Sequence, residues 1–397
     1  MRKIGVITVA RSDYGIYFPV LSCIHADTEL ELCLMVSGMH LSPEFGMTVD
    51  KITDDGFPIA AKVNMLLSAD GPTGIAKSMG LGTLGFAEVY DQHRPDILLV
   101  LGDRFEMMAA ALAALPFKIP VAHIHGGERS EGAFDDALRH AMTKLSHLHF
   151  VATDEYARRV IQLGEQAWRI TVSGAPGLDH LDTVELLSVE ALEKQYGISL
   201  NPPPLLVTFH PVTLEYEQTR WQVEELLAAL NTFERPMVFT LPNADTKSRD
   251  IIKMITDFVA RHKLRWKFDN LGTRGYFSLM ALSAAMVGNS SSGIIEAPSF
   301  ELPVVNIGRR QQGRTQAKNV IDSGHPRNEI KQAIHKALRP EFRKTLQGLR
   351  NPYRCGNASK KIVARLKEVD LNENLIFKRF HDLDFALADG MGSDGLK

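Results

Sequence analysis

Short, continuously apolar runs alternate with helical patterns along most of this chain, and this alternation restricts the possible folds more than any other feature of the sequence. The run Ile97–Leu101 is typical, because it contains only apolar residues and is followed to about Leu115 by a segment rich in Ala, Met and Leu. Such a run indicates a strand that is buried on both faces of a parallel sheet. Repeated alternation with helices predicts a doubly wound α/β fold.

The alternation occurs in two blocks separated by Gly174–Gly177, a stretch with the composition of a hinge. The predicted strands of the first block are Lys3–Ala10, Leu30–Ser37, Pro58–Val63, Ile97–Leu101, Ile119–Ile124, Leu148–Ala152 and Arg169–Ser173. Those of the second block are Leu205–Phe209, Met237–Leu241, Arg265–Phe268, Ala285–Gly288 and Val304–Ile307. A chain of 397 residues is also longer than one hydrophobic core usually organises. We therefore expect domains at residues 1–175 and 176–356, a last helix within 357–380, and a flexible tail at 381–397.

Composition excludes several classes of protein. The 45 basic and 47 acidic side chains give a net charge of −2, so there is no electrostatic case for a nucleic-acid or membrane-surface partner. Cys23, Cys33 and Cys355 have no metal-ligand spacing and fit small buried residues in a reducing compartment. The first apolar run is short and ends at Arg11, unlike a signal peptide, so we expect a cytoplasmic protein.

Ionisable residues follow the predicted strands of the first block. Asp103 and Arg104 come directly after one strand, and His125 and Glu128 follow the next. Asp135, with Asp136 beside it, then opens a predicted helix, where a carboxylate suits the positive end of the helix dipole. Parallel strands end at one edge of the sheet, where ligands bind in open α/β folds. Each residue alone also fits a helix cap or a loop, but the cluster predicts an acid/base site.

Other polar residues at strand ends could bind an anion. Arg11 follows the first strand beside a helix N-terminus, although a solvated turn arginine would look the same. In the second block, Ser290 and Ser291 lead into a predicted helix that carries Glu296. Hydroxyl and N–H groups there suit a phosphate, and Glu296 could bind ribose, but a serine N-cap with a surface Glu also fits. The remaining polar residues at strand ends are His210, Asn243 and Arg310.

Several longer motifs occur together in one order. They are ARSDYG at Ala10–Gly15, SGMHL at Ser37–Leu41, LGDRFE at Leu101–Glu106, HIHGGE at His123–Glu128, DDALRHAMTKLSHLH at Asp135–His149, FHPVT at Phe209–Thr213, PNADT at Pro242–Thr246, GNSSSGIIE at Gly288–Glu296 and NIGRRQQGR at Asn306–Arg314. In this combination the chain resembles the hydrolysing UDP-N-acetylglucosamine 2-epimerases of sialic-acid and legionaminic-acid pathways. The resemblance covers nearly the whole chain.

The resemblance implies the GT-B architecture, in which two Rossmann-like domains face each other across a cleft that holds the UDP-sugar. It implies that residues 357–380 return to pack on the N-terminal domain. It also implies a homodimer or homotetramer, with no metal and no redox cofactor in the chemistry.

The implied reaction eliminates UDP from C1 while the C2 proton is removed, and then adds water to the resulting 2-acetamidoglucal, which gives N-acetylmannosamine. Matched to the family's positions, Asp103, Glu128 and Asp135 form the acid/base set, and Asp136 is the alternative to its neighbour. Many members of the family have Glu where this chain has His125, so His125 is expected either to act as a base or to orient a carboxylate. The residues that match UDP-contacting positions are Arg11, His210, Asn243, Ser290, Ser291, Glu296 and Arg310, and Arg104 is expected close by.

Four other readings remain open. A GT-B glycosyltransferase would share the fold and the UDP site but would not need the acid/base cluster. A nucleotide-sugar sensor would not need that cluster either. A non-hydrolysing epimerase would read closer to HVEAGLR than to HIHGGER. The nearest alternative is a hydrolysing epimerase of UDP-2,4-diacetamido-2,4,6-trideoxyglucose, which differs at C4 and C6 of the sugar.

Overall fold

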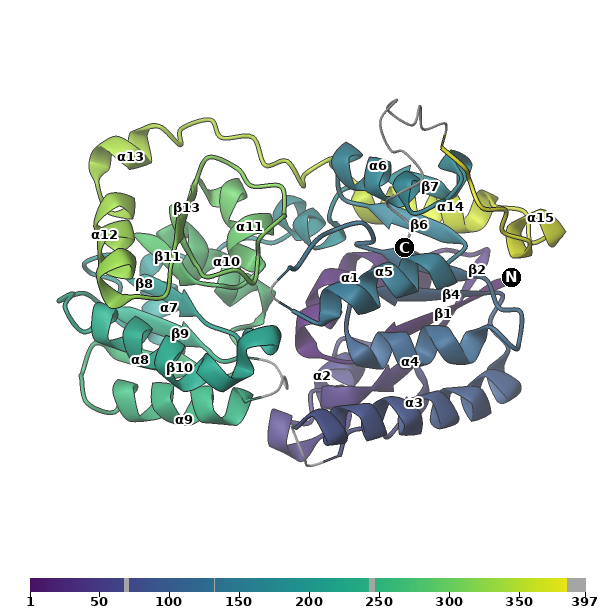
Figure 1. The fold of residues 1–397 in the computed structure, drawn as a ribbon, viewed down its shortest axis with the longest axis horizontal. Helices are drawn as coiled ribbons and strands as arrows, with labels where there is room; N and C mark the ends of the chain where they lie inside the picture. Colours follow the sequence, from purple (N-terminus) through teal and green to yellow (C-terminus); the bar gives the residue numbers. More distant parts are fainter. Residues whose placement is uncertain (68–70, 132, 243–246, 384–397) are drawn as a thin grey trace, which may run out of the picture.

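The computed structural model describes residues 1–67, 71–131, 133–242 and 247–383. Within these ranges the chain forms two parallel β-sheets, each covered by helices, that lie side by side (Figure 1). Both sheets are doubly wound, which confirms the predicted fold class. No helix of the described ranges is long and apolar enough to cross a membrane.

The first sheet has the strand order β3-β2-β1-β4-β5-β6-β7 among the described residues. Its strands are β1 (Arg2–Thr8), β2 (Leu30–Ser37), β3 (Ile59–Val63), β4 (Ile97–Leu101), β5 (Val121–Ile124), β6 (Leu148–Val151) and β7 (Ile170–Val172). The helices around it are α1 (Arg11–His25), α2 (Val49–Asp54), α3 (Pro72–His93), α4 (Phe105–Ala114), α5 (Asp135–Leu145) and α6 (Asp154–Gln162). The strand order reverses between β1 and β4, which pair in parallel with Ile4 opposite Ile97. A crevice therefore opens at the carboxyl ends of these two strands, next to Arg11 and Asp103.

The second sheet repeats the topology, with the order β10-β9-β8-β11-β12-β13 in the described part of the chain. Its strands are β8 (Leu205–Thr208), β9 (Met237–Thr240), β10 (Arg265–Phe268), β11 (Ala285–Gly288), β12 (Val304–Ile307) and β13 (Val320–Ser323). Its helices are α7 (Val189–Tyr196), α8 (Thr219–Leu230), α9 (Ser248–Val259), α10 (Gly272–Leu282), α11 (Ser292–Ile295), α12 (Arg327–Ala337) and α13 (Pro340–Lys344). The order reverses between β8 and β11, so His210 and Ser290 lie at the second crevice.

Two chain segments run side by side from one sheet to the other. The backbone N–H of Ala175 donates to the carbonyl of Tyr353 at 2.9 Å. Asp179 accepts hydrogen bonds from the N–H groups of Ala358 and Ser359, which open the helix α14 (Ala358–Glu368). Helix α14 packs its apolar side chains into the core of the first sheet. We propose domain boundaries at residues 175 and 356, where these two segments cross.

The structure differs from the sequence prediction in two local elements near the crevices. Arg11, expected to lie beside a helix N-terminus, is itself the first residue of α1, and the N–H groups of Val9 and Ala10 just before it donate to the Asp13 carboxylate. Glu296, expected near the start of a longer helix, caps the C-terminus of the short helix α11. Of the tail predicted as flexible, residues 384–397 lie outside the described ranges.

Candidate active site

A cavity of about 340 Å³ lies where the carboxyl edges of the two sheets face each other. Both walls carry residues that the sequence singled out. The predicted site residues that line the cavity are Arg11, Asp103, Arg104, His125, Glu128, Asp135, His210, Ser290, Ser291, Glu296 and Arg310. The twelfth, Asn243, lies outside the described residues. The fold thus brings together side chains that are up to 299 residues apart in sequence, from Arg11 to Arg310.

Asp103 lies just beyond β4, where Gly102 adopts a φ of +75° that turns the chain toward the cavity. Its carboxylate forms an ion pair with Arg139 of α5, whose guanidinium is almost fully buried. Arg139 also donates to the backbone carbonyl of His125 at 2.8 Å. One buried arginine therefore ties the ends of β4 and β5 together and fixes Asp103 at the cavity wall.

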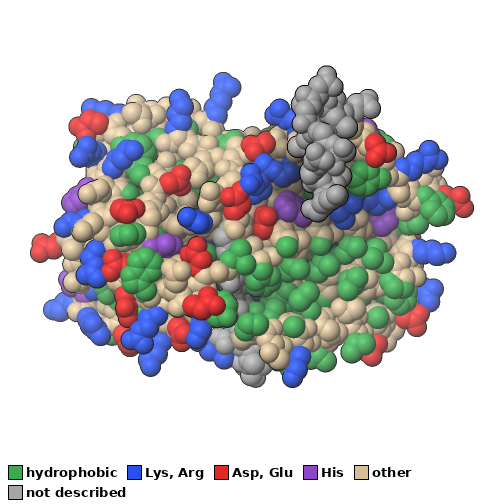
Figure 2. Space-filling model, viewed as in Figure 1, with side chains coloured by type: hydrophobic (Ala, Val, Ile, Leu, Met, Phe, Trp, Pro, Cys, Tyr) green, Lys and Arg blue, Asp and Glu red, His purple; other side chains and the backbone are tan. Residues whose placement is uncertain are grey.

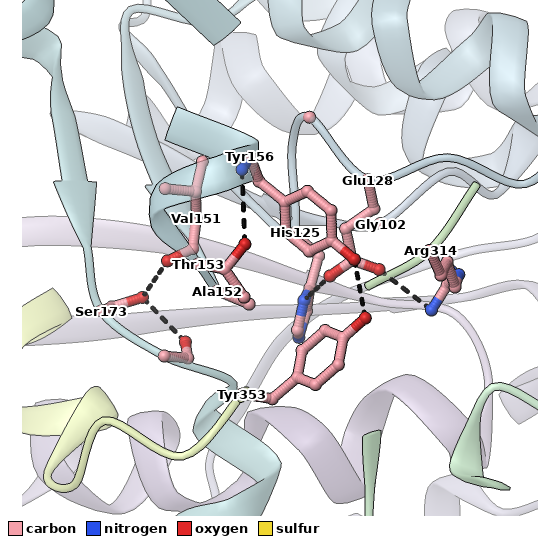
Figure 3. A network of polar contacts seen from close by, with 12 residues as sticks. Gly102, His125, Glu128, Val151, Ala152, Thr153, Tyr156, Ser173, Arg314 and Tyr353 are labelled. Carbon is pink, nitrogen blue, oxygen red and sulfur yellow. Dashed lines mark hydrogen bonds and ion pairs between the residues drawn. The ribbon is translucent and has the colours of Figure 1, made fainter. Parts of the chain in front are cut away.

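His125 and Glu128 form a buried pair in the turn after β5, shown in Figure 3. His125 itself has a φ of +65°, a left-handed conformation that is uncommon for a residue with a side chain and that occurs often at functional sites. Its Nδ1 lies 2.5 Å from Oε1 of Glu128, and the other carboxylate oxygen of Glu128 lies 3.0 Å from Nη1 of Arg314. Burial alone would raise the pKa of Glu128, but the positive charge of Arg314 and the contact with His125 hold it well below its ordinary value.

An ionised Glu128 fixes the hydrogen on the imidazole. A carboxylate can only accept a hydrogen bond, so Nδ1 of His125 carries the hydrogen. The lone pair of a neutral imidazole then lies on Nε2, which is the nitrogen that can accept a proton. The geometry therefore suits a histidine base that is oriented by a carboxylate.

The structure separates the two neighbouring carboxylates at the start of α5. Asp135 lines the cavity, whereas Asp136 does not. Asp136 accepts the backbone N–H of Ser130 at 2.5 Å and lies 3.4 Å from Nε2 of His140. Burial alone would raise the pKa of Asp136, but these partners hold it below its ordinary value. Asp136 therefore has a local role in fixing the loop before α5.

His210, on the opposite wall, lies in a basic cluster to which both sheets contribute, Arg310 from the second and Arg11 and Arg104 from the first. Its backbone N–H and carbonyl are held by the side chain of Asn289 at 2.7 and 2.8 Å. Burial lowers the pKa of His210 far below its ordinary value, and the nearby charges of Arg310, Arg104 and Arg11 lower it further. A neutral histidine among three guanidinium groups is an environment that favours an anion, such as a diphosphate.

Ser290, Ser291 and Glu296 complete this wall. The hydroxyl of Ser290 accepts the backbone N–H of Ser292 at 3.3 Å. Burial raises the pKa of Glu296 above its ordinary value, against a hydrogen bond from Ser292. Among the described residues, Oε2 of Glu296 has no hydrogen-bond partner, so it can accept or donate one hydrogen bond to a ligand hydroxyl.

Sequence reasoning missed several residues that shape this site. Arg139 and Arg314 lie within motifs that the sequence analysis quoted, but nothing in the local pattern shows that they contact Asp103 and Glu128. Tyr156 and Tyr353 lie outside all of these motifs, although their rings are buried beside Glu128. Only the tertiary fold reveals these four contacts.

Comparison with known proteins agrees with this arrangement. The family model described as UDP-N-acetylglucosamine 2-epimerase matches residues 22–367. A GDP/UDP-N,N'-diacetylbacillosamine 2-epimerase (hydrolyzing) from Campylobacter jejuni is 37% identical over 385 residues, which are 96% of this chain and 99% of that protein. The polysialic acid biosynthesis protein P7 from Escherichia coli is 34% identical over 385 residues, 96% of this chain and 98% of that protein.

A solved structure extends the comparison to the fold. The UDP-GlcNAc 2-epimerase from Neisseria meningitidis, bound to UDP-GlcNAc, has a TM-score of 0.79 to this chain at 21% identity. The match covers 93% of this chain and 100% of the solved one, so the two proteins share both domains of one fold. From its family match and its full-length relatives, this chain belongs to the UDP-N-acetylglucosamine 2-epimerase family.

Proposed function

We propose that the protein is a hydrolysing UDP-N-acetylglucosamine 2-epimerase, which converts UDP-N-acetylglucosamine and water to N-acetylmannosamine and UDP for the synthesis of a sialic-type sugar. The observation that carries the proposal is the cavity itself, in which the acid/base groups of the first sheet lie together with a basic cluster supplied by both sheets. A glycosyltransferase or a nucleotide-sugar sensor would need the basic cluster alone.

In the first stage, the C2 proton leaves the sugar as the bond between C1 and the UDP oxygen breaks, which gives 2-acetamidoglucal and UDP. We assign proton transfer at C2 and at the leaving oxygen to the set Asp103, Asp135 and the His125–Glu128 pair. Water then adds across the double bond, with its hydroxyl on C1 and a proton on the opposite face of C2. General acid–base groups of this kind typically contribute a factor of about 10² to 10⁴ to the rate.

The basic cluster stabilises the other product. As UDP leaves, negative charge grows on the diphosphate, and Arg11, Arg104 and Arg310 are positioned to offset it. We place the ribose hydroxyls at Glu296 and a phosphate at Ser290 and Ser291. The site would work without a metal ion, and within the described residues no cluster of His, Cys, Asp and Glu side chains is arranged to hold one.

One observation favours a second substrate. The relative with 37% identity is a diacetylbacillosamine 2-epimerase by its name. We therefore keep UDP-2,4-diacetamido-2,4,6-trideoxyglucose as the alternative substrate. It would undergo the same two stages, because the substituents at C4 and C6 do not take part in the bond changes.

NMR of the purified protein with each UDP-sugar in deuterated water tests the proposal. We expect free N-acetylmannosamine with deuterium at C2, together with released UDP, from UDP-N-acetylglucosamine. Turnover of the diacetamido sugar alone would move the protein to the alternative substrate. Inertness toward both sugars would contradict the epimerase assignment.

We further propose a cytoplasmic homodimer or homotetramer. Its three cysteines are free thiols, which fits a reducing compartment. Helices α3 and α4 present the exposed apolar side chains of Leu81, Leu84, Leu112 and Leu115, and Figure 2 shows a wide hydrophobic area there. An area of this kind, surrounded by polar side chains, is typical of a protein–protein contact.

A further inference from the structure

Residues Arg314 and Thr315 lie in the segment between β12 and β13, yet their contacts are with the other side of the cavity. Nη1 of Arg314 lies 3.0 Å from Glu128, and its Nε donates to the carbonyl of Arg129 at 3.2 Å. Its Nη2 donates to the hydroxyl of Ser130 at 3.3 Å. A single guanidinium from the second domain therefore contacts three successive residues of the catalytic turn in the first.

Two buried tyrosines hold the backbone of this segment in place. Figure 3 shows the two tyrosines beside Glu128 and Arg314. Tyr156, on α6 of the first domain, accepts the backbone N–H of Thr315 at 3.0 Å. Tyr353, in the segment that returns to the first domain, donates its hydroxyl to the carbonyl of Thr315 at 2.9 Å. The two hydroxyls lie 2.6 Å apart, and Tyr156 must be the donor between them because the proton of Tyr353 is already used.

These hydrogen bonds satisfy both backbone groups of Thr315. The position of Arg314 is therefore set by its neighbour's backbone rather than by a flexible side-chain contact. A guanidinium placed in this way loses little conformational freedom when it pairs with a carboxylate. Both tyrosines lie against the pair that Arg314 forms with Glu128, so the contact is shielded from water.

The same segment also reaches the basic cluster around His210. Arg310, four residues earlier, lines the cavity beside His210 and donates to the carbonyl of Asn289 at 3.3 Å. Gln311 donates to the same carbonyl at 2.9 Å. One end of the segment is therefore fixed at the proposed diphosphate site and the other end at the acid/base pair.

We propose that Arg314 is a positioning residue, held by Tyr156 and Tyr353, that keeps Glu128 ionised and His125 correctly oriented only while the second domain is docked on the first. The inference rests on the proposed function for its catalytic consequence. Bound UDP-sugar, held at the Arg310 end, thereby favours an assembled acid/base pair at the other end. The charged and titratable groups that face Glu128 are His125, Arg139, Arg314, Tyr156 and Tyr353.

The test replaces Arg314 by Met and by Lys, with Lys318→Met as the control. Lys318 lies exposed on the same segment, outside the cavity lining. For Arg314→Met we expect kcat to fall on the order of 100-fold, with nearly unchanged UDP binding by calorimetry. The acid limb of kcat should move to higher pH by roughly one unit, because Glu128 loses the cation that favours its ionised form. Arg314→Lys should restore part of both effects.

A second measurement does not depend on turnover. The ¹⁵N chemical shifts of His125, assigned from the spectrum of His125→Gln, report which ring nitrogen carries the hydrogen. We expect a hydrogen on Nδ1 in the unsubstituted protein and a mixture of both forms in Arg314→Met. Tyr353→Phe, which retains the ring, should shift the spectrum in the same direction by a smaller amount.

The outcomes separate the inference from the proposed function. An unchanged acid limb and an unchanged His125 spectrum in Arg314→Met would overturn the positioning role, even if kcat fell. A fall in UDP affinity that matched the fall in kcat/KM would also overturn it, because Arg314 would then be a UDP ligand. Absence of turnover in the unsubstituted protein would contradict the proposed function alone, and the His125 spectrum would still decide the role of Arg314.

Discussion

At the residue scale, the carboxylate of Asp103 combines partial exposure to the cavity with a buried cationic partner, Arg139. Replacement by Asn retains the shape but removes the charge and the proton-carrying ability. We expect Asp103→Asn to lower kcat at least about 10²-fold while UDP binding stays nearly intact. Steady-state kinetics and calorimetry with UDP check this. Weak UDP binding with near-normal turnover at saturating substrate would contradict a catalytic role.

Arg310 has the complementary role in the basic cluster. Its guanidinium lies close enough to His210 to lower the pKa of that histidine, after the larger effect of burial. Loss of a charge-assisted contact to phosphate costs about 1.5 to 3 kcal/mol, so Arg310→Ala should weaken UDP binding by roughly 10- to 100-fold. Arg309→Ala, an exposed neighbour outside the cavity lining, is the matched control. Equal dissociation constants for the two variants would remove Arg310 from the UDP site.

How far the sequence predicts this site depends on what positions each residue. Asp103, His125 and Ser290 follow short apolar strands directly, so the edge of the sheet could be inferred from the chain. The partners Arg139, Arg314 and Tyr353 reach the site from helices or connecting segments, and their placement depends on how two sheets pack. No local spacing encodes that packing, so these partners could not be predicted.

At the scale of single elements, central strands were predictable. The strands β2, β4, β11 and β12 have the predicted bounds, and so does the edge strand β10. The strand β13 was missed because its sequence VIDS contains no continuous apolar run. A strand of this kind and short helices such as α11 owe their form to their neighbours rather than to an intrinsic pattern.

Glu165, just after α6, binds the segment that follows α14 and provides a prediction at this scale. Glu165, almost fully buried, accepts hydrogen bonds from Lys378 at 2.9 Å and Lys144 at 2.6 Å and contacts His149. Burial alone would raise the pKa of Glu165, but these partners, His149 first, lower it to about 2. A carboxyl group with a lowered pKa in the folded state stabilises the fold at every pH above its ordinary pKa. This contribution is lost as the pH falls toward the folded-state pKa of about 2.

We therefore expect Glu165→Gln to lower the free energy of unfolding at pH 7 by roughly 3 kcal/mol. The difference between the two proteins should shrink as the pH falls from 5 toward 3, as measured by urea unfolding at each pH. Glu155→Gln, at a more exposed carboxylate, is the control and should change little. A difference that stays constant across this pH range would contradict the role of the Glu165 charge.

At the scale of the whole molecule, the two crossing segments place both crevices in one cavity. The contact of Ala175 with Tyr353, and of Asp179 with the start of α14, holds the segments together, so a movement of one sheet relative to the other must bend both. The hydrophobic cluster formed by Val151, Tyr156, Ile294 and Tyr353 fills the junction. Docking of the domains, assembly of the acid/base pair and binding of UDP therefore all depend on the same relative position of the two sheets.

The apolar area over α3 and α4 gives the last prediction. Leu84 of α3 is 67% exposed, which leaves an apolar side chain in water unless a second copy of the chain covers it. If this area is the contact between two copies, a charge at its centre would have to be buried without a partner, which is costly. Leu84→Glu should then shift the protein from dimer or tetramer toward smaller species in light scattering, whereas Leu214→Glu, at a 59% exposed leucine of the second domain, should not. If the unsubstituted protein is a monomer, there is no such contact between copies. If both variants keep the oligomer of the unsubstituted protein, the contact lies elsewhere.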